Sequence, residues 1–387
     1  MTTMGIILLL IGWFIGFYFL DNPLLGLIIA ALVWGIMNLV ALFQGDSIIL
    51  GMSGAKKIGP DDHPRLYNVV EEMKIASGLQ KMPDIYIMDD PALNAFSTGR
   101  DPDHASVAIT SGLLDKLNRD ELQGVIGHEI GHIANRDIRL MMLASILLGA
   151  IVMLAWYATR ISFFGGMAGG RRNSSGGGGG IVTLIIVVVG LVLMILAPIM
   201  AQLIYFAVSR NREYLADASS ALYTRYHEGL ASALEKLENN DTKVRTANKA
   251  TAPMYISNPF YKGASAGNDL MATHPPLTER IRILRAMSGA SYTDYETSYK
   301  AMTNNSLIPA SALAGASTMA LRQASAGAYP GEINEQIDRT RETSDLLWRM
   351  NNYRNITCKN CGTGMRLPPK YDQPEVQCPH CGYVNQL

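Results

Sequence analysis

Four long stretches of this chain contain no charged residue, and they constrain its fold more than any other feature. The stretches are residues 4–20, 24–43, 140–158 and 181–208. A helix that crosses the hydrocarbon core of a bilayer needs roughly 20 consecutive apolar residues. Core helices of soluble proteins usually keep a polar face, and these stretches mostly lack one. The sequence therefore predicts four transmembrane helices, with buried core helices as the alternative.

The charged residues that flank these stretches predict how the chain is oriented in a membrane. The connection over residues 21–23 has no Lys or Arg, whereas basic residues follow the second stretch, precede the third and follow the fourth. Because segments with Lys and Arg stay on the cytoplasmic side, both termini and most polar parts are expected there. Three arginines in the Gly/Ser-rich connection between the third and fourth stretches oppose this orientation. The first stretch lacks a basic leader, so we expect a retained hairpin and not a signal peptide.

The charge balance limits the partners of the chain. Lys plus Arg and Asp plus Glu both number 33, so the formal net charge is zero. A basic excess is the usual electrostatic footprint of nucleic-acid binding, and no nucleic-acid partner is expected. The partner that the four apolar stretches predict is the lipid bilayer.

The polar segments predict an α+β fold in which helices predominate. Short alternating runs indicate the strands of a small sheet, at residues 84–88, 94–97 and 106–110. A helix should begin near Arg119, with Asn118 as its N-cap, and continue to Asn135. Beyond Met287 the chain is rich in Ala and Ser and loses periodicity until a polar helix near residues 332–351.

One short motif on the predicted helix carries the chemistry. His128 and His132 are four residues apart, so they share one face of the helix and can converge on one metal ion. Glu129 stands beside them as a general base, and this H-E-x-x-H arrangement is typical of zinc hydrolases. A pair of ordinary surface histidines is the alternative. The motif favours a zinc hydrolase, which needs no Ser or Cys nucleophile.

A candidate third ligand follows the fourth apolar stretch. Catalytic zinc usually takes three protein ligands and keeps one position open. Glu213 could complete a His-His-Glu site, and Asp217, on the same helical face, could accept the outer N–H of a ligand histidine. Alternatively, Glu213 is an exposed carboxylate paired with Arg210 or Arg212. The histidines precede the third stretch and Glu213 follows the fourth, so a shared zinc requires both on one side of the membrane.

All four cysteines lie in two C-x-x-C pairs near the C-terminus, Cys358/Cys361 and Cys378/Cys381. The sixteen residues between the pairs match the spacing of a zinc ribbon, and a zinc site made of four cysteines is closed and structural. Two disulfides are the alternative, which a cytoplasmic location disfavours. We therefore expect a structural zinc ion in a ribbon over residues 353–387. Whether the ribbon captures substrate, docks a protein partner or only stabilises the C-terminus stays open.

Four runs of the sequence occur in an order that is characteristic of a known family. They are V-A-I-T-S-G-L-L at 107–114, E-L-x-x-V-I-x-H-E at 121–129, R-E-x-x-A-D at 212–217 and H-P-P-L at 274–277. Together with the membrane stretches, these runs resemble the M48 family of integral-membrane zinc metalloproteases, especially its bacterial heat-shock (HtpX-like) branch. The resemblance covers residues 1–287 and implies a gluzincin-type protease domain. It implies that His128, His132 and Glu213 bind zinc and that Glu129 is the catalytic base. It also implies that Asp217 contacts the zinc ligands without binding the metal itself.

The same resemblance implies two further sites less directly. Asn94, Ala95 and Phe96 match a strand of the family, and an exposed sheet edge there could pair with an extended substrate backbone. An ordinary half-buried strand is the alternative. His274, which is followed by two prolines, could stabilise the oxyanion of the tetrahedral intermediate, or it could be a structural histidine.

The resemblance thus implies a multi-pass protease of the bacterial inner membrane with its active site in the cytoplasm. Its expected activity is peptide-bond hydrolysis in protein substrates, for quality control of misfolded membrane proteins. The alternatives are a precursor-processing protease of the same family and a catalytically silent scaffold that recruits partners through the ribbon. Before the ribbon we expect an N-terminal hairpin at 1–45, a protease domain at 46–138 and 209–288, a second hairpin at 139–208, and a linker with a polar helix at 289–352.

Overall fold

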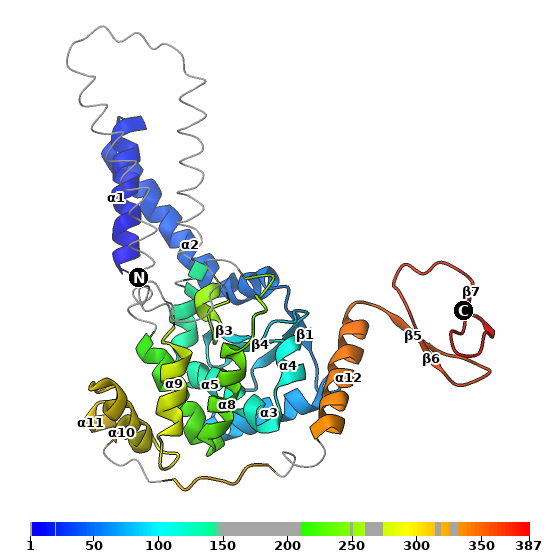
Figure 1. Cartoon of the computed structure of the whole chain (residues 1–387). Coiled ribbons are helices and arrows are strands. Elements are labelled where there is room, and N and C mark those ends of the chain that lie inside the picture. The colour runs from blue at the N-terminus through cyan, green and yellow to red at the C-terminus, as the bar shows by residue number, and fades with distance from the viewer. Residues whose placement is uncertain are drawn as a thin grey trace.

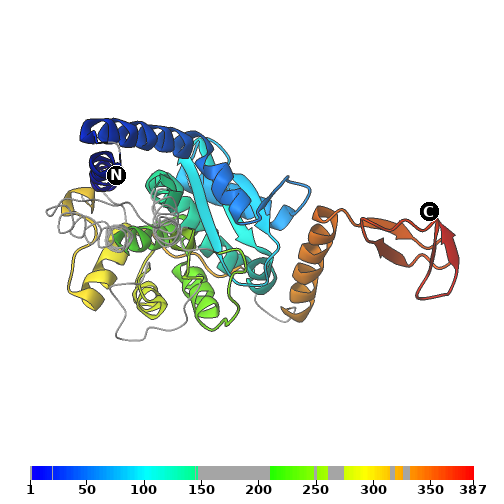
Figure 2. The ribbon, with the colours of Figure 1, turned by 90° about the horizontal axis from the view of Figure 1, so that it is seen from above.

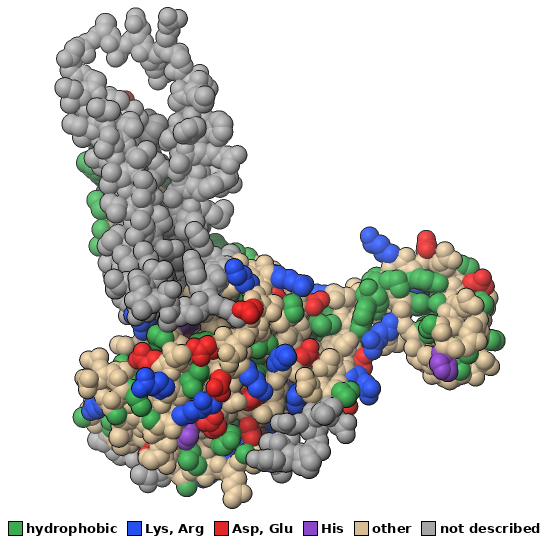
Figure 3. Space-filling model, in the orientation of Figure 1, with side chains coloured by type: hydrophobic (Ala, Val, Ile, Leu, Met, Phe, Trp, Pro, Cys, Tyr) green, Lys and Arg blue, Asp and Glu red, His purple; other side chains and the backbone are tan. Residues whose placement is uncertain are grey.

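An N-terminal helical hairpin, a body of helices and one sheet, and a small C-terminal β module follow one another along the chain (Figure 1). The structure is a computed structural model, and it describes residues 2–19, 21–143, 145–146, 210–247, 251–259, 274–313, 319–325 and 332–387. Seen from above, the last helix and the β module extend to one side of the body (Figure 2). Figure 3 shows acidic and basic side chains interspersed over the visible face of the body, in keeping with the zero net charge.

The N-terminal hairpin consists of α1 (Thr2–Phe19) and α2 (Pro23–Met52). The Asn22 side chain caps α2 by accepting a hydrogen bond from the Leu25 N–H at 3.1 Å. Glycines let the two helices touch, since a Cβ at Gly26 would lie 2.2 Å from the carbonyl oxygen of Gly12. Close packing through small residues is typical of helices in a membrane.

Among the described residues, α2 is the one helix that is long and apolar enough to cross a membrane, with a mean hydropathy of 2.4. Within its most apolar window 17% of the residues are buried, and Leu24, Leu32 and Phe43 are each more than 60% exposed. The first two predicted spans are therefore helical. The third is helical at residues 140–143 and 145–146, beyond which it lies outside the described residues, as does the whole of the fourth. The described structure thus contains one candidate span where the sequence predicts four.

α2 continues to Met52, past the apolar stretch that ends at Phe43. Its last turns pack against the body: a Cβ at Gly45 would lie 2.8 Å from Ile146 Cδ1, and Ile49 and Leu50 are buried. The helix therefore extends beyond the boundary predicted from charge, because contacts with the body hold its final turns.

The body contains a four-stranded sheet in the order β1-β2-β4-β3. β2 and β4 are parallel, and the two outer pairs are antiparallel. The strands are β1 (Lys56–Ile58), β2 (Asp84–Met88), β3 (Ala95–Asp101) and β4 (His104–Thr110). The three predicted strands are confirmed, and β3 runs further than expected into a tight return to β4. β1 was missed because three residues, two of them lysines, are too few to show alternation.

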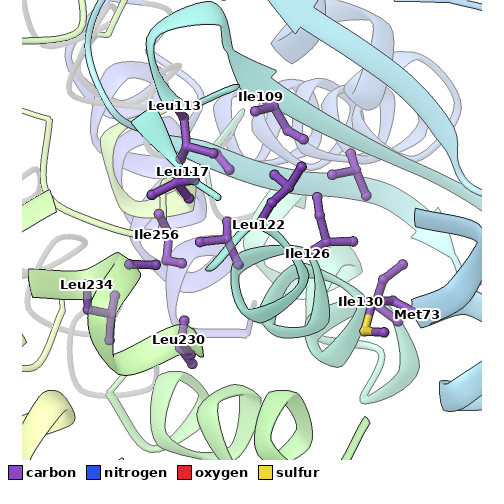
Figure 4. Packing of buried hydrophobic residues seen from close by; sticks show 14 of the residues in the cluster. Met73, Ile109, Leu113, Leu117, Leu122, Ile126, Ile130, Leu230, Leu234 and Ile256 are labelled. Atoms are coloured by element: carbon purple, nitrogen blue, oxygen red, sulfur yellow. The ribbon is translucent and has the colours of Figure 1, made fainter. Parts of the chain in front are cut away.

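Helices cover this sheet and enclose a shared core. They are α3 (Pro64–Ser77), α4 (Ser111–Lys116), α5 (Arg119–Ala134), α8 (His227–Glu238) and α9 (Leu277–Arg285), with further helical residues at 137–143, 145–146 and 210–224. α5 lies at the centre, and every residue from Asp120 to Ile133 is buried. Leu122 and Ile126 of α5 gather with Ile109 of the sheet and Leu230 of α8 (Figure 4).

Glycines on α5 let neighbouring helices reach its backbone. A Cβ at Gly124 would lie 2.5 Å from the Leu230 nitrogen in α8. A Cβ at Gly131 would lie 3.0 Å from Ser219 Cβ, in the helical residues 210–224. Any larger residue at these positions would push the neighbouring helices away from α5.

After α9, the chain forms α10 (Tyr292–Thr303), α11 (Ala310–Leu313) and α12 (Glu332–Met350). α12 confirms the predicted polar helix, whereas the expectation of a linker is wrong for α10. Ser291 and Asp294 form a capping box at the start of α10, and Tyr295 and Tyr299 bury one of its faces. The buried face is built from tyrosines among polar residues, which hides its periodicity from a count of aliphatic residues.

The C-terminal β module consists of two small hairpins. They are formed by β5 (Arg354–Thr357) with β6 (Gly364–Leu367) and by β7 (Glu375–Gln377) with β8 (Val384–Gln386). Each C-x-x-C pair lies in the turn of one hairpin, and Gly362 and Gly382 adopt φ of 70° and 76° in these turns. Glycine is favoured there because other residues rarely adopt positive φ.

Candidate active site

The start of α5 sets the position of both histidines of the H-E-x-x-H motif. The Asn118 side chain accepts the Glu121 N–H at 2.9 Å, and Glu121 Oε2 accepts the Asn118 N–H at 2.8 Å. This capping box begins the helix where the sequence predicts it. His128 and His132 follow one turn apart, with ring centroids 4.8 Å from each other, and both side chains are buried.

Glu213 approaches the two histidines from the helical residues 210–224. Its Oε1 lies 3.4 Å from His132 Nε2, and its Oε2 lies 3.7 Å from His128 Nε2. All three ligand atoms lie within 4.8 Å of one another. Ligands held about 2.1 Å from a tetrahedral zinc ion are about 3.4 Å apart. His128 Nε2 is fully buried and has no hydrogen-bond partner among the described residues, as expected of a nitrogen that binds a metal.

Each of these histidines is held from behind by an aspartate, and each aspartate pairs with an arginine. His128 Nδ1 lies 2.9 Å from Asp217 Oδ1, whose carboxylate also accepts two hydrogen bonds from Arg280, at 2.6 and 2.8 Å. His132 Nδ1 lies 3.3 Å from Asp137 Oδ2, and Asp137 pairs with Arg212. Such outer partners orient ligand histidines and set their tautomers.

The sequence predicted Asp217 at this position but missed Asp137 and Arg280. Glu213 is buried, and Arg212 pairs with Asp137. The alternative in which Glu213 is an exposed carboxylate is therefore excluded. Arg280 is fully buried and also contacts Glu213 Oε2 at 3.3 Å. Its position three residues after the H-P-P-L run was the available signal, because a charged residue on the helix that follows a site motif can reach that site.

Burial and charge shift the pKa values of the ligand side chains in opposite directions. Burial lowers the pKa of His128 to about 4, which favours the neutral imidazole. Although burial opposes it, hydrogen bonds that the His132 ring donates to the Asp137 and Glu213 carboxylates raise the pKa of His132 to about 10. Burial also opposes ionisation of Glu213, but His274 and His132 hold its pKa well below the usual range. A metal ion competes with protons for the ring nitrogens of His132, so its binding should be pH-dependent.

Glu129 follows His128 on α5 and is also buried. Burial raises the pKa of its carboxyl to about 7, and His132 and the Ser97 hydroxyl partly offset this effect. Neither carboxylate oxygen accepts a well-formed hydrogen bond from the described residues. A carboxylate with a pKa near neutrality is suited to accept and return a proton.

The structure brings His274 to the same site. Its Nδ1 lies 3.2 Å from Glu213 Oε2, and its side chain is buried. Neither ring nitrogen makes a well-formed hydrogen bond within the described part of the chain. His274 therefore adjoins a carboxylate of the ligand set, from a segment that comes after both ligand-bearing helices in sequence.

The expected exposed edge at Asn94, Ala95 and Phe96 is wrong. All three residues are buried, and the Ile256 N–H donates to Ala95 O at 2.9 Å beside an isolated bridge between Phe96 and Tyr255. The Asn94 amide also donates to the carbonyl of residue 257 at 3.0 Å. A segment far along the chain covers this edge, which a pattern of local alternation cannot reveal.

The four cysteines form a second cluster in the β module. Cys358 Sγ lies 3.7 Å from Cys381 Sγ, and Cys361 Sγ lies 3.7 Å from Cys378 Sγ. A disulfide would bring two sulfurs to about 2.05 Å, whereas four thiolates around a tetrahedral zinc ion are about 3.8 Å apart. All four cysteines are free. The spacing fits a metal site and excludes the two disulfides in this structure.

Comparison with known proteins adds a family to this geometry. Residues 60–288 match the sequence model of peptidase family M48. A relative named Protease HtpX homolog, from Dictyoglomus turgidum, is 48% identical over 263 residues, which are 68% of this chain and 82% of the relative. Another of the same name, from Streptococcus gordonii, is 42% identical over 281 residues, which are 73% of this chain and 93% of the relative.

A more distant likeness exists among solved structures. The crystal structure of S. mikatae Ste24p matches with a TM-score of 0.43 and 22% identity, over 72% of this chain and 62% of that chain. The M48 sequence model ends at residue 288, so α10, α12 and the β module lie beyond it.

Proposed function

This chain belongs to peptidase family M48 and is a zinc metalloprotease, and from that premise we propose how its residues do this work. His128, His132 and Glu213 hold the catalytic zinc, and Glu129 is the general base. The observation that carries the proposal is the approach of three ligand atoms to within 4.8 Å of one another, around a buried His128 Nε2 that has no hydrogen-bond partner among the described residues. The substrates are proteins or peptides.

The chain's own residues move and hold the protons of the reaction. When bound, zinc supplies a Lewis acid that polarises the scissile carbonyl and makes water more acidic. Glu129 takes a proton from water on a carboxylate oxygen and returns it to the nitrogen of the leaving amine. Its raised pKa of about 7 supports this role, because the carboxylate can then exist in both protonation states near neutral pH.

Asp217 and His274 assist through different members of the ligand set, His128 and Glu213. Asp217 accepts the Nδ1–H of His128 and so keeps Nε2 unprotonated for the metal, a role that their 2.9 Å contact supports. His274 stabilises the negative charge that develops on the carbonyl oxygen. This role is supported by its two ring nitrogens, which make no well-formed hydrogen bond to the residues that the structure describes. Asn94, Ala95 and Phe96 act on the substrate only indirectly, by fixing the segment that covers β3.

We also propose that the enzyme is a multi-pass protein of the bacterial inner membrane with its active site and termini in the cytoplasm. The apolar stretches and the basic residues beside them support this topology. The contact of Asp137 with Arg212 supports a return of the chain to one side, because these residues flank the third and fourth apolar stretches. Removal of misfolded membrane proteins is the corresponding task.

The β module holds a second, structural zinc ion through Cys358, Cys361, Cys378 and Cys381. The sulfur–sulfur distances of 3.7 Å support this assignment. A module with so few buried apolar residues (Met365 and two cysteines form its core) needs the metal to fold. Docking of a protein partner is the further role proposed for it.

Metal analysis and a protease assay on the detergent-purified chain test this proposal. The wild type should hold two zinc ions and His128→Ala one, whereas Glu129→Gln should keep both ions and lose proteolysis. Retained proteolysis in Glu129→Gln would refute the role of that residue. Broad degradation of unfolded membrane proteins is expected, and a single defined product would indicate precursor processing instead. A wild type that binds zinc but cleaves nothing would indicate a scaffold.

A further inference from the structure

A short segment beyond the M48 region binds the start of α5. We call residues 319–325 the clasp. This segment runs along the lower side of the body in Figure 1, and in sequence it lies between two stretches that the structure does not describe. Arg322 Nη2 donates to Asp120 Oδ1 and to Gln123 Oε1, both at 2.7 Å. Ser325 donates to the same Asp120 carboxylate from its backbone N–H and its hydroxyl, again at 2.7 Å.

The clasp also binds the end of the helix that carries Glu213. Arg322 Nε donates to the carbonyl of Thr224 at 2.8 Å, and the Arg322 N–H donates to the carbonyl of Arg225 at 2.9 Å. Arg225 Nε returns a hydrogen bond to Ala320 O at 3.0 Å. The Arg322 guanidinium also lies 4.9 Å from the ring centre of Tyr226. These bonds satisfy carbonyls that the end of a helix leaves without intrahelical partners.

One guanidinium therefore joins the first turn of α5 to the last turn of residues 210–224. The two helices are in contact along their length, since Ser220 Oγ donates to Gly124 O at 2.7 Å and a Cβ at Gly131 would lie 3.3 Å from Ala216 Cα. Gly124 contacts Ser220, whereas Gly131, further along α5, contacts Ala216, which precedes Ser220 in the chain. The two helices are therefore antiparallel. α5 carries two of the proposed zinc ligands, and residues 210–224 carry the third.

The remaining groups of the first turn of α5 are also held, but by single neighbouring helices. Glu121 accepts from Ser232 and Lys236 of α8, each at 2.7 Å. Gln123 donates to Glu72 of α3 at 2.6 Å while its carbonyl oxygen accepts from Arg322. The clasp, in contrast, contacts both this turn and the end of the helix that carries Glu213.

We infer that the clasp is a positioning element, in which Arg322 and Asp120 hold the two ligand-bearing helices in register and thereby tune the affinity of the catalytic site for zinc. The inference rests on the proposed zinc ligands. An α-helix is stiff over the distance involved, since His128 lies eight residues, or about 12 Å, from Asp120. A small rotation or slide at the clasped ends therefore changes the separation between the histidines and Glu213. Arg322 contacts no ligand itself, so its effect passes through the helices.

The test is zinc release from the full-length protein, equilibrated with increasing concentrations of a chelator. The wild type should release two ions in two steps, and His128→Ala identifies the step of the catalytic ion. Arg322→Ala should release that ion at about 3- to 10-fold lower chelator concentration. This effect is smaller than the loss of metal affinity, about 10- to 100-fold, that follows when a residue hydrogen-bonded to a metal ligand is replaced. The step of the cysteine site should not move. In the protease assay kcat should fall while KM changes less than about twofold, because binding of substrate is not altered.

Two variants separate positioning from general destabilisation. Arg285→Ala also removes an arginine that forms ion pairs, in this case with Glu228 and Glu235 of α8 and not with α5. It should leave both zinc steps in place. Ser325→Ala removes one hydrogen bond to Asp120 and should shift the catalytic step in the same direction as Arg322→Ala, by less. If both clasp variants lower only the melting temperature, or if Arg285→Ala shifts the catalytic step equally, the inference is wrong. A wild type without a step that depends on His128 would overturn the proposed zinc site as well.

Discussion

Replacing Arg280 by methionine should destabilise the protein far more than the same change at Arg285, five residues further along α9. Both arginines pair with two carboxylates, so the two variants remove the same number of charged partners. The Arg280 side chain is fully buried against Asp217 and Glu213, which are also buried. The Arg285 side chain is 40% exposed, and Glu228 and Glu235 are similarly exposed. The comparison therefore isolates the effect of burial.

The magnitude follows from what each replacement leaves behind. Without Arg280, the Asp217 carboxylate stays buried with a hydrogen bond to the neutral His128 ring but without the opposite charge of the guanidinium, and removal of one partner of a buried ion pair typically costs about 3–5 kcal/mol. Exposed pairs contribute less than about 1 kcal/mol, because water solvates the carboxylates that remain. For a domain of this size, 1 kcal/mol changes the melting temperature by about 2–4 °C. We expect a loss of about 6–20 °C for Arg280→Met and less than about 4 °C for Arg285→Met.

Thermal unfolding in one detergent, with equal zinc for all variants, measures these shifts. Adding Asp217→Asn to Arg280→Met should recover part of the loss, because the uncompensated charge is then absent. Equal melting temperatures for Arg280→Met and Arg285→Met would refute the reasoning. So would a double variant that is less stable than Arg280→Met alone, since the stranded carboxylate would then not be the cause.

Three further predictions concern the helices and the β module. Burial lowers the pKa of His63, the N-cap of α3, from 6.5 to about 4. The folded state therefore keeps its full stability above pH 6.5 and loses about 3 kcal/mol as the pH falls to 4. His63→Asn, in which asparagine can also cap the helix, should abolish that loss. A variant whose free energy of unfolding depends on pH as in the wild type would contradict this prediction. Gly124→Ala would place a Cβ 2.5 Å from the Leu230 nitrogen and should lower the free energy of unfolding by about 1–3 kcal/mol, whereas Gly51→Ala, with open space around it, should not. Cys361→Ser should release one zinc ion and leave proteolysis intact; loss of proteolysis with the catalytic zinc still bound would show that the module takes part in the reaction.

Local rules predicted the central helix and its motif correctly. The capping box at Asn118 joins residues three apart, and the spacing of His128 and His132 places them on one face of any α-helix. The strands at β2 and β4 are likewise confirmed, because their alternation is a local property. The structure brings Glu213 to the two histidines, as its place after the fourth apolar stretch suggested.

Expectations that depended on distant parts of the chain were less successful. The edge at Asn94 to Phe96 was expected to be exposed, but Tyr255 and Ile256 cover it. α10 was taken as part of a linker because its buried tyrosines pack against other helices and show no aliphatic pattern. In both cases the neighbour that buries the segment is remote in sequence.

The sequence alone therefore determined which side chains can do the chemistry: a two-histidine motif, a carboxylate base and four cysteines at zinc spacing. Only the tertiary structure decided which charges support them. Asp217 pairs with Arg280 over 63 residues, and Asp120 pairs with Arg322 over 202. Helix periodicity and capping act between residues a few positions apart, so they leave such pairs undetermined. The pairs follow from packing, because a buried carboxylate must find an opposite charge among whichever helices enclose it.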